Sequence, residues 1–163
     1  MSCRYYYLPV LFALLSGCAS TPEFDTSQVD RSLTPQSVIA EPEISLGKVT
    51  LWGGTILDTR NLKDVTQIEV LAYPLNASYR PMLESKPLGR FIIKHSGFLE
   101  PTTYAQGRLL TVSGSISEMQ SGKVGETTNS YPVISDRQLH LWSQTSDSNR
   151  SNVHFGVGIG VGL

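Results

Sequence analysis

The chain has 163 residues, the length of one ordinary domain with short appendages rather than two full domains. Hydrophobic residues make up 40% of it and charged residues 17%, a balance that suits a globular core. The formal net charge is −1, so the sequence supplies no basic field and we expect no nucleic-acid partner.

The N-terminal residues have the pattern of a secretory leader. Arg4 provides a positive charge, and residues 5–15 form an apolar run too short to span a bilayer as a helix. Two small residues follow, and then Cys18, whose thiol is nucleophilic enough to take a lipid. The resulting Leu-Ser-Gly-Cys pattern resembles the lipobox of bacterial lipoproteins. The resemblance implies that residues 1–17 are a signal peptide and that Cys18 carries a thioether-linked diacylglycerol.

Lipid attachment at Cys18 defines the first expected partner, the lipid bilayer. Two or more acyl chains give stable anchoring, whereas one gives only marginal binding. The next residue is Ala19 rather than Asp, which in enteric bacteria points to sorting to the outer membrane. Cys3 is lost with the leader, so the mature fold has no thiol left for a disulfide. We therefore expect a lipid-anchored protein of the outer membrane.

Residues 18–44 are predicted to be a lipidated N-terminus and a flexible tether. They contain Ser, Thr, Pro, Asp, Gln and Glu with scattered single apolar residues, and they show no strand or helix period. A flexible segment of about 25 residues reaches roughly 25–30 Å. The alternative is a strand or short helix around residues 37–40 that packs on the domain.

Five runs of β-branched and apolar residues follow, and each predicts a strand. In the first run Val49 and Leu51 share one parity and Ile56 the other, so a bulge at Gly53-Gly54 would put all three on one face. The fourth run alternates most cleanly between apolar residues and Thr or Ser, which indicates that one of its faces is wet. The runs cover residues 48–57, 66–75, 88–95, 107–117 and 131–142.

These runs predict an all-β fold. The nearest template for five strands in about a hundred residues is a small five-stranded antiparallel barrel of the OB type, over residues 45–143. A β-sandwich is the alternative. The connection between the third and fourth runs carries Phe98, Leu99 and Tyr104, which we expect to plug one end of the barrel.

Residues 144–163 are predicted to be a hinge rich in Ser and Asn followed by a Gly-rich tail. In residues 153–163 apolar residues alternate with glycine. Because ordering so many glycines costs entropy, one interpretation is a mobile tail. A second is a strand that adds to a sheet edge, in self-association or on an envelope protein partner. A third is a membrane strand, which needs a closed oligomer to satisfy its backbone.

The sequence shows no converging catalytic or metal-ligating groups. His95, His140 and His154 stand far apart, with no cysteine or carboxylate at ligand spacing. A triad of Ser96, His95 and Asp136 has no support in the sequence. We therefore predict no catalytic residue, no metal site, no cofactor and no enzyme activity.

Aromatic residues near the expected strand ends offer a candidate binding surface. Such residues stack on sugars or bases in some OB barrels, although the same positions also suit capping of the core. No basic groove accompanies them, which disfavours nucleic acid. The candidate ligand-stacking residues are Trp52, Tyr73, Tyr104 and Trp142.

Several segments together resemble the Slp family of outer membrane lipoproteins, over about residues 10–143. The most specific is Ser-Gly-Phe-Leu-Glu-Pro at residues 96–101, while the aliphatic tail departs from the family pattern. The other carriers are the lipobox, residues 51–56, residues 89–95, Tyr104, residues 107–116, residues 131–134 and residues 139–142.

The resemblance implies an outer membrane location, lipidation and expression in starvation or stress, and it supplies no catalytic residue. We therefore expect a non-enzymatic adaptor or structural component of the envelope. The alternative is a binding module for a glycan or another small envelope ligand, held in an aromatic groove.

Overall fold

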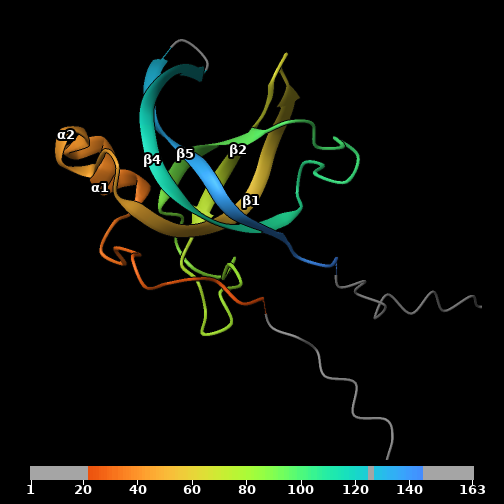
Figure 1. The fold of residues 1–163 in the computed structure, drawn as a ribbon, viewed down its shortest axis with the longest axis horizontal. Helices are drawn as coiled ribbons and strands as arrows, with labels where there is room; N and C mark the ends of the chain where they lie inside the picture. The colour runs from red at the N-terminus through yellow and green to blue at the C-terminus, as the bar shows by residue number, and fades with distance from the viewer. Residues whose placement is uncertain (1–21, 125–126, 145–163) are drawn as a thin grey trace, which may run out of the picture.

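The computed structural model describes residues 22–124 and 127–144 of the chain. Its strands close into one barrel in the order β1-β2-β3-β5-β4, and β4 pairs with β1 to complete the circle (Figure 1). The all-β fold and the OB-like barrel are thus confirmed, and the sandwich is excluded. The strands are β1 (Val49–Asn61), β2 (Val65–Tyr73), β3 (Gly89–Ser96), β4 (Leu109–Val124) and β5 (Thr127–Leu141).

Some predicted features fall outside the described residues. They are the signal peptide, the lipid-attachment residue Cys18 and the Gly-rich tail at 153–163. The part of the chain that is described has no helix long and apolar enough to cross a membrane.

One of the five strand pairings differs from the wholly antiparallel barrel that we expected. β3 and β5 run parallel, with Ile92 opposite Val133 and Lys94 opposite Ser135. The reason is the connectivity: β4 crosses to the free edge of β1, and the β4–β5 hairpin then brings β5 back beside β3 in the same direction. The other four pairings are antiparallel, as predicted.

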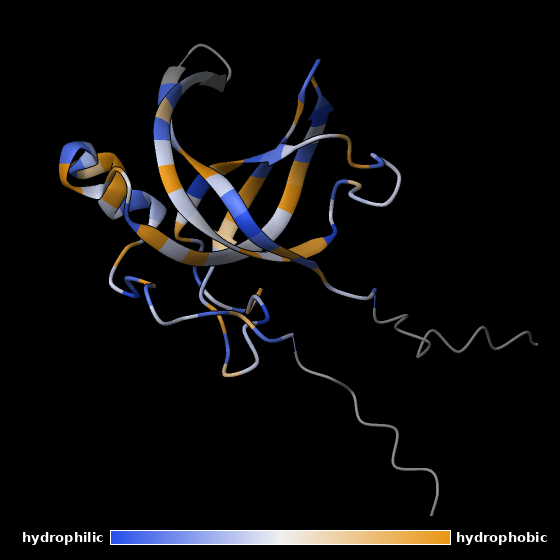
Figure 2. Ribbon diagram, viewed as in Figure 1, coloured by the Kyte–Doolittle hydropathy of each residue, from blue (hydrophilic) through white to orange (hydrophobic). Residues whose placement is uncertain are grey.

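The barrel interior is filled by residues that alternate along the strands. Hydrophobic and hydrophilic bands alternate along β4 and β5 (Figure 2), which is the period expected of strands with one buried face. In β2 the inward residues are Ile68, Val70 and Ala72, at alternate positions. The other buried core residues on the strands are Trp52, Ile56, Phe91, Ile93, Leu110, Val112, Ile116 and Ile134.

The predicted bulge in β1 is wrong in position. Trp52 and Ile56 face the core with one parity, whereas Val49 and Leu51 are only partly buried, so no extra residue is needed between them. The register shift instead lies between Ile56 and Asp58. The glycine pair before it serves close approach: a Cβ on Gly54 would collide with the carbonyl oxygen of Leu71 in β2.

The predicted wet face of β4 is also partly wrong, because Thr111 and Ser113 are buried. The loop between β2 and β3 (residues 74–88) folds over this part of the barrel. The hydroxyl of Thr111 donates a hydrogen bond to the carbonyl oxygen of Tyr79 in this loop (2.7 Å) and accepts one from the indole of Trp142 (3.0 Å). Thr111, which the alternation of β4 places on the outer face, is therefore bonded to the β2–β3 loop rather than exposed to solvent.

The flexible tether is wrong for its described part, residues 22–44. Two short helices, α1 (Pro35–Ala40) and α2 (Pro42–Ser45), occupy the region where a short helix was the alternative, and Val38 is fully buried. Thr34 and Ser37 form a capping box that starts α1. The helices are too short to show a period in the sequence, since only one or two residues of each reach the core.

The segment from α1 closes one end of the barrel. Val38 joins the core cluster, and the indole nitrogen of Trp52 donates to the carbonyl oxygen of Leu33 (2.9 Å). The plug expected from the β3–β4 connection (residues 97–108) is only partly present. Leu99 and Tyr104 pack against the core, but Phe98 is 69% exposed.

Packing of α1 can be tested by truncating its buried residue. Val38→Ala is expected to lower the free energy of unfolding by about 2 kcal/mol, because it leaves a cavity in the core. The control Ile39→Ala, at an exposed position of the same helix, should change it by less than about 0.5 kcal/mol. Urea denaturation of both variants measures this difference, and equal stability would show that residues 22–44 do not pack on the barrel.

Candidate functional site

A polar groove crosses the outer face of the barrel where the β4–β5 hairpin faces strands β1 to β3. It encloses about 150 Å³. Its position follows from alternation, since Ile68 and Val70 point into the barrel and leave their neighbours Gln67 and Glu69 on the outer face. The lining residues are Asp58, Arg60, Gln67, Glu69, Arg90, Ile92, Gln120, Gly122 and Tyr131.

Hydrogen-bonding side chains form the walls of the polar groove. Arg90 Nη1 lies 2.9 Å from Glu69 Oε1, and the two side chains are about one third exposed. Arg60 is similarly bonded to Asp58. Across the groove, the amide of Gln67 in β2 donates to that of Gln120 in β4 (3.2 Å). Each arginine is thus balanced by a carboxylate, and the walls carry both donors and acceptors.

The floor of the polar groove is apolar. Ile92 of β3 packs with Tyr131 and Val133 of β5 in a small cluster separate from the barrel core. Gly122 on β4 lets the hairpin curl over this cluster, because a Cβ there would lie 2.8 Å from the Tyr131 ring. An apolar floor with balanced hydrogen-bonding walls matches a neutral, polyhydroxylated ligand such as a sugar.

A second cavity, the aromatic pocket, lies between β1, β2, the β2–β3 loop and Arg31 of the N-terminal segment. It has a volume of about 330 Å³. Asn76 fixes the adjoining part of the β2–β3 loop, since its side-chain oxygen accepts hydrogen bonds from the backbone N–H groups of Ser78 and Arg80. The lining residues are Arg31, Leu51, Trp52, Ala72, Tyr73, Pro74, Leu75, Asn76, Ala77, Tyr79 and Leu88.

The backbone at Tyr79 is held in the left-handed region, with φ 63°, an uncommon conformation for a tyrosine. Its carbonyl accepts the Thr111 hydrogen bond, and its ring meets Phe24 edge-on with centroids 5.6 Å apart. The loop contacts therefore over-determine this residue, as a strained backbone requires.

The structure brings two of the four predicted stacking residues together. Trp52 and Tyr73 both line the aromatic pocket, but Trp52 is 5% exposed and packs edge-on against Phe91, so most of it is core. Tyr104 lies in the β3–β4 connection, outside this pocket. Trp142 follows β5, where the Arg80 guanidinium lies 5.2 Å from its ring centroid. Stacking of these residues on a ligand stays a prediction.

The structure also joins two residues that sequence reasoning kept apart. His95 Nδ1 lies 2.7 Å from Asp136 Oδ2, linking the neighbouring strands β3 and β5. Tyr104 lies close to them, and its pKa is raised by burial first and by the charge of Asp136 second. Within the described ranges, no hydroxyl is hydrogen-bonded to the His95 ring.

His140 is the other described histidine, and it lies against Trp142. The two rings meet edge-on with centroids 4.5 Å apart. Burial lowers the pKa of His140. Among the residues that the structure places, no group of three metal-ligating side chains exists.

Sequence reasoning missed the polar groove because its residues come from all five strands. Each wall residue reads in the sequence as an ordinary solvent-facing position of a strand. The only local signal was the charged or amide residue at alternate positions of the second and third runs, such as Gln67, Glu69 and Arg90. Convergence depended on the barrel closure and on the long hairpin, which extends beyond the predicted fourth run.

Comparison with known proteins gives a family match. The model of the outer membrane lipoprotein Slp family matches residues 15–158. The chain is 32% identical to an uncharacterized lipoprotein, YeaY, of Escherichia coli K12, over 82% of this chain and 70% of that protein. It is 30% identical to an uncharacterized protein of Haemophilus influenzae, over 79% of this chain and 70% of the other. It is 26% identical to the outer membrane protein Slp of E. coli K12, over 79% and 69%.

The hydroxyl that holds the β2–β3 loop offers a test of the aromatic pocket's rigidity. Thr111→Val keeps the shape but leaves the Tyr79 carbonyl and the Trp142 indole without their partner. We expect it to lower the free energy of unfolding by about 1–3 kcal/mol and to speed amide exchange in residues 76–80. Thr111→Ser, which keeps the hydroxyl, should behave nearly as the parent. Calorimetry and hydrogen exchange measure both effects, and a stable, slowly exchanging Thr111→Val would contradict them.

Proposed function

The chain belongs to the Slp family of outer membrane lipoproteins, and we propose that it acts there as a non-enzymatic adaptor. One end of the molecule is held to the bilayer by the lipid on Cys18, and the polar groove binds a glycan of the envelope. The observation that carries the proposal is the groove between the β4–β5 hairpin and the outer face of β1 to β3.

The fold supports a glycan as the ligand. OB barrels bind oligosaccharides and oligonucleotides on the face of strands 2 and 3, between the first and the last hairpin loops. This is an analogy of fold, and the residues must carry the function. Here they include two arginines, two carboxylates and two glutamines over the apolar floor of Ile92 and Tyr131. Such a site hydrogen-bonds hydroxyl groups without attracting a net charge.

The proposal of a binding protein rather than an enzyme has two supports. The carboxylates of the polar groove, Asp58 and Glu69, are each bonded to an arginine, which suits holding a ligand more than transferring a proton. The His95–Asp136 pair has no serine bonded to it among the residues described. A link to starvation or stress is supported by the family resemblance alone.

The aromatic pocket supports a second candidate site for the same class of ligand. Tyr73 and Tyr79 both line it, and its volume of about 330 Å³ falls within the range of small-molecule sites. Sugar rings stack on such side chains in glycan-binding proteins. The two sites lie on different parts of the barrel and are separable by mutation.

Ligand titration can decide between the two sites. Soluble peptidoglycan fragments and lipopolysaccharide core oligosaccharides, titrated into isotope-labelled protein, are expected to shift amide signals around the polar groove. Arg90→Gln should raise the dissociation constant about tenfold or more, because it removes a charged hydrogen bond of about 1.5–3 kcal/mol. Lys63→Gln is the matched control, since it removes an exposed charge from the β1–β2 turn, outside the groove.

A third variant, Tyr73→Ala, tests the aromatic pocket as the alternative glycan site. If Tyr73→Ala weakens binding and Arg90→Gln does not, the glycan site is the aromatic pocket. Absence of any shift with every fragment would contradict a glycan-binding adaptor of either kind and would leave a protein partner as the ligand to be sought by crosslinking.

Anchoring is tested separately at Cys18. The mature parent protein should fractionate with the outer membrane and carry diacylglycerol by mass spectrometry, whereas Cys18→Ser should lose the lipid and leave the membrane fraction. Two or more acyl chains are needed for stable anchoring, so residual membrane association of Cys18→Ser as strong as that of the parent would contradict lipid anchoring.

A further inference from the structure

We propose that the β2–β3 loop is a second membrane contact, which lies on the bilayer surface and sets the orientation of the barrel. The inference rests on the lipid anchor proposed at Cys18. It assigns a partner, the interfacial region of a phospholipid bilayer, to a surface that neither the family match nor the polar groove explains.

The chain between the lipid and the fold is short. Pro22 is the first described residue, and three residues lie between it and Cys18, which makes four Cα–Cα steps. Four such steps span at most about 14 Å even when the chain is fully extended. The barrel is therefore held much closer to the bilayer than a tether of about 25 residues would allow.

The N-terminal segment joins the barrel beside the β2–β3 loop. Phe24 is buried and meets the ring of Tyr79 in the β2–β3 loop. The neighbouring backbone is fixed to β5, since Asp25 N–H donates to Gln138 (3.0 Å) and the amide of Gln138 donates to the Glu23 carbonyl (3.4 Å). The short connection between Cys18 and the fold (the leash) thus starts beside the β2–β3 loop.

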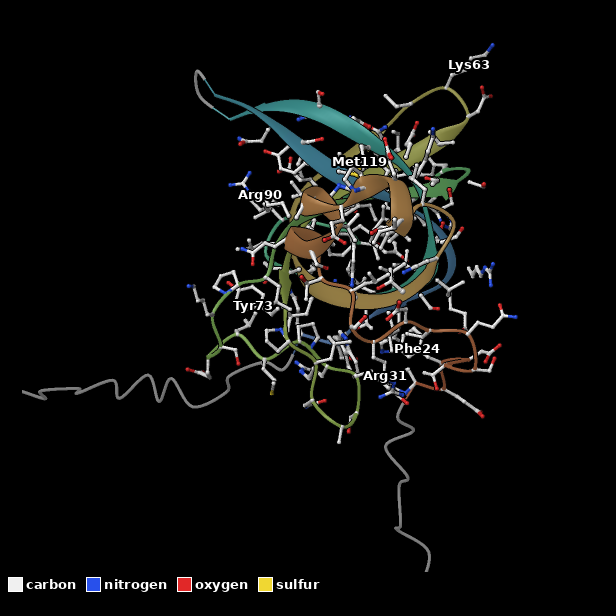
Figure 3. The ribbon with its side chains drawn as sticks, turned by 90° about the vertical axis from the view of Figure 1, so that its left-hand side faces the viewer. Phe24, Arg31, Lys63, Tyr73, Arg90 and Met119 are labelled. Atoms are coloured by element: carbon white, nitrogen blue, oxygen red, sulfur yellow. The ribbon has the colours of Figure 1, made fainter. Side chains whose placement is uncertain are left out.

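The figures show the same end of the molecule from two directions. The described N-terminal segment and the β2–β3 loop both lie below the barrel in Figure 1 and in Figure 3. Lys63, in the β1–β2 turn, lies at the opposite end from Phe24 and Arg31 (Figure 3). With the leash attached below, the β2–β3 loop faces the bilayer and the β1–β2 turn faces away from it.

The β2–β3 loop carries exposed apolar side chains. Met82 and Leu83 are 37% and 48% exposed at a turn of the loop. Apolar side chains carried beside a lipid anchor enter the boundary between headgroups and acyl chains and add to the binding energy of the anchor. Tyr79 and Tyr73 near them belong to the residue type that favours this boundary.

Charge does not drive this contact. The entry segment (residues 22–31) and the β2–β3 loop together carry three basic residues, Arg31, Arg80 and Lys86, against four acidic ones, Glu23, Asp25, Asp30 and Glu84. A surface with this balance has no attraction to anionic lipids. The contact should therefore depend on apolar insertion and be insensitive to salt and to the fraction of anionic lipid.

Other exposed apolar residues supply matched controls. Ile44 lies in α2 on the side of the barrel, and Phe98 lies in the β3–β4 connection. Both are at least as exposed as Leu83, at 62% and 69% against 48%. If exposure alone decided the contact, Leu83, Ile44 and Phe98 would all contact the bilayer equally. The short connection to the lipid anchor instead predicts that Leu83 contacts it and the other two do not.

The test uses the full-length, processed protein in phospholipid vesicles. The sequence has cysteines only at positions 3 and 18, so Leu83→Cys, Ile44→Cys and Phe98→Cys each add a single thiol for a nitroxide spin label once the leader is removed and the lipid occupies Cys18. Collision with oxygen, which concentrates in lipid, is compared with collision with a water-soluble nickel chelate.

The label at position 83 is expected to collide mainly with oxygen and the labels at 44 and 98 mainly with the nickel chelate, at low and high salt alike. A label at 83 that is as open to nickel as the others, in protein that floats with the vesicles, would overturn the loop contact alone. A label at 44 that is the most shielded would also overturn it, since the barrel would then lie on α2. Protein that does not float with vesicles would overturn the anchor, and the inference with it.

Discussion

Barrel closure depends on β1, because this strand pairs with β4 through its first half and with β2 through its second. The two pairings overlap at residues 53–55, so the backbone there is bonded on both sides. Gly53 and Gly54 permit this: a Cβ at Gly54 would strike β2, and one at Gly53 would lie 2.7 Å from the hydroxyl of Thr111. The close approach lets the β2–β3 loop reach over β1 and bind Thr111, which in turn shapes the aromatic pocket.

Closure also separates two sites with different chemistry. The β2–β3 loop forms the aromatic pocket with β1, β2 and Arg31 of the N-terminal segment, while the β4–β5 hairpin and the outer face of β1 to β3 form the polar groove. In the orientation that we propose, with the β2–β3 loop on the bilayer, the polar groove is kept away from the membrane contact. That arrangement suits the proposed adaptor role.

The sequence predicted the features that depend on local periodicity. The five strands and the OB-like barrel were predicted from the alternating apolar runs, and the lipobox and family segments indicated an outer membrane lipoprotein. It could not reveal features that depend on tertiary contact. Val38 is a lone apolar residue in a polar segment, and Thr111 reads as solvent-facing until the loop that covers it is placed. The polar groove was not predictable because no two adjacent residues of the chain form it.

The claim that the polar groove binds an envelope glycan is tested most directly in living cells. A photo-crosslinking residue placed at Gln120, on the hairpin wall of the groove, would capture whatever occupies it, and mass spectrometry of the captured product would identify it. We predict adducts that contain hexose or amino sugar and disappear when Arg90 is replaced by Gln. Capture of protein alone, or of nothing, at this position would contradict a glycan-binding groove.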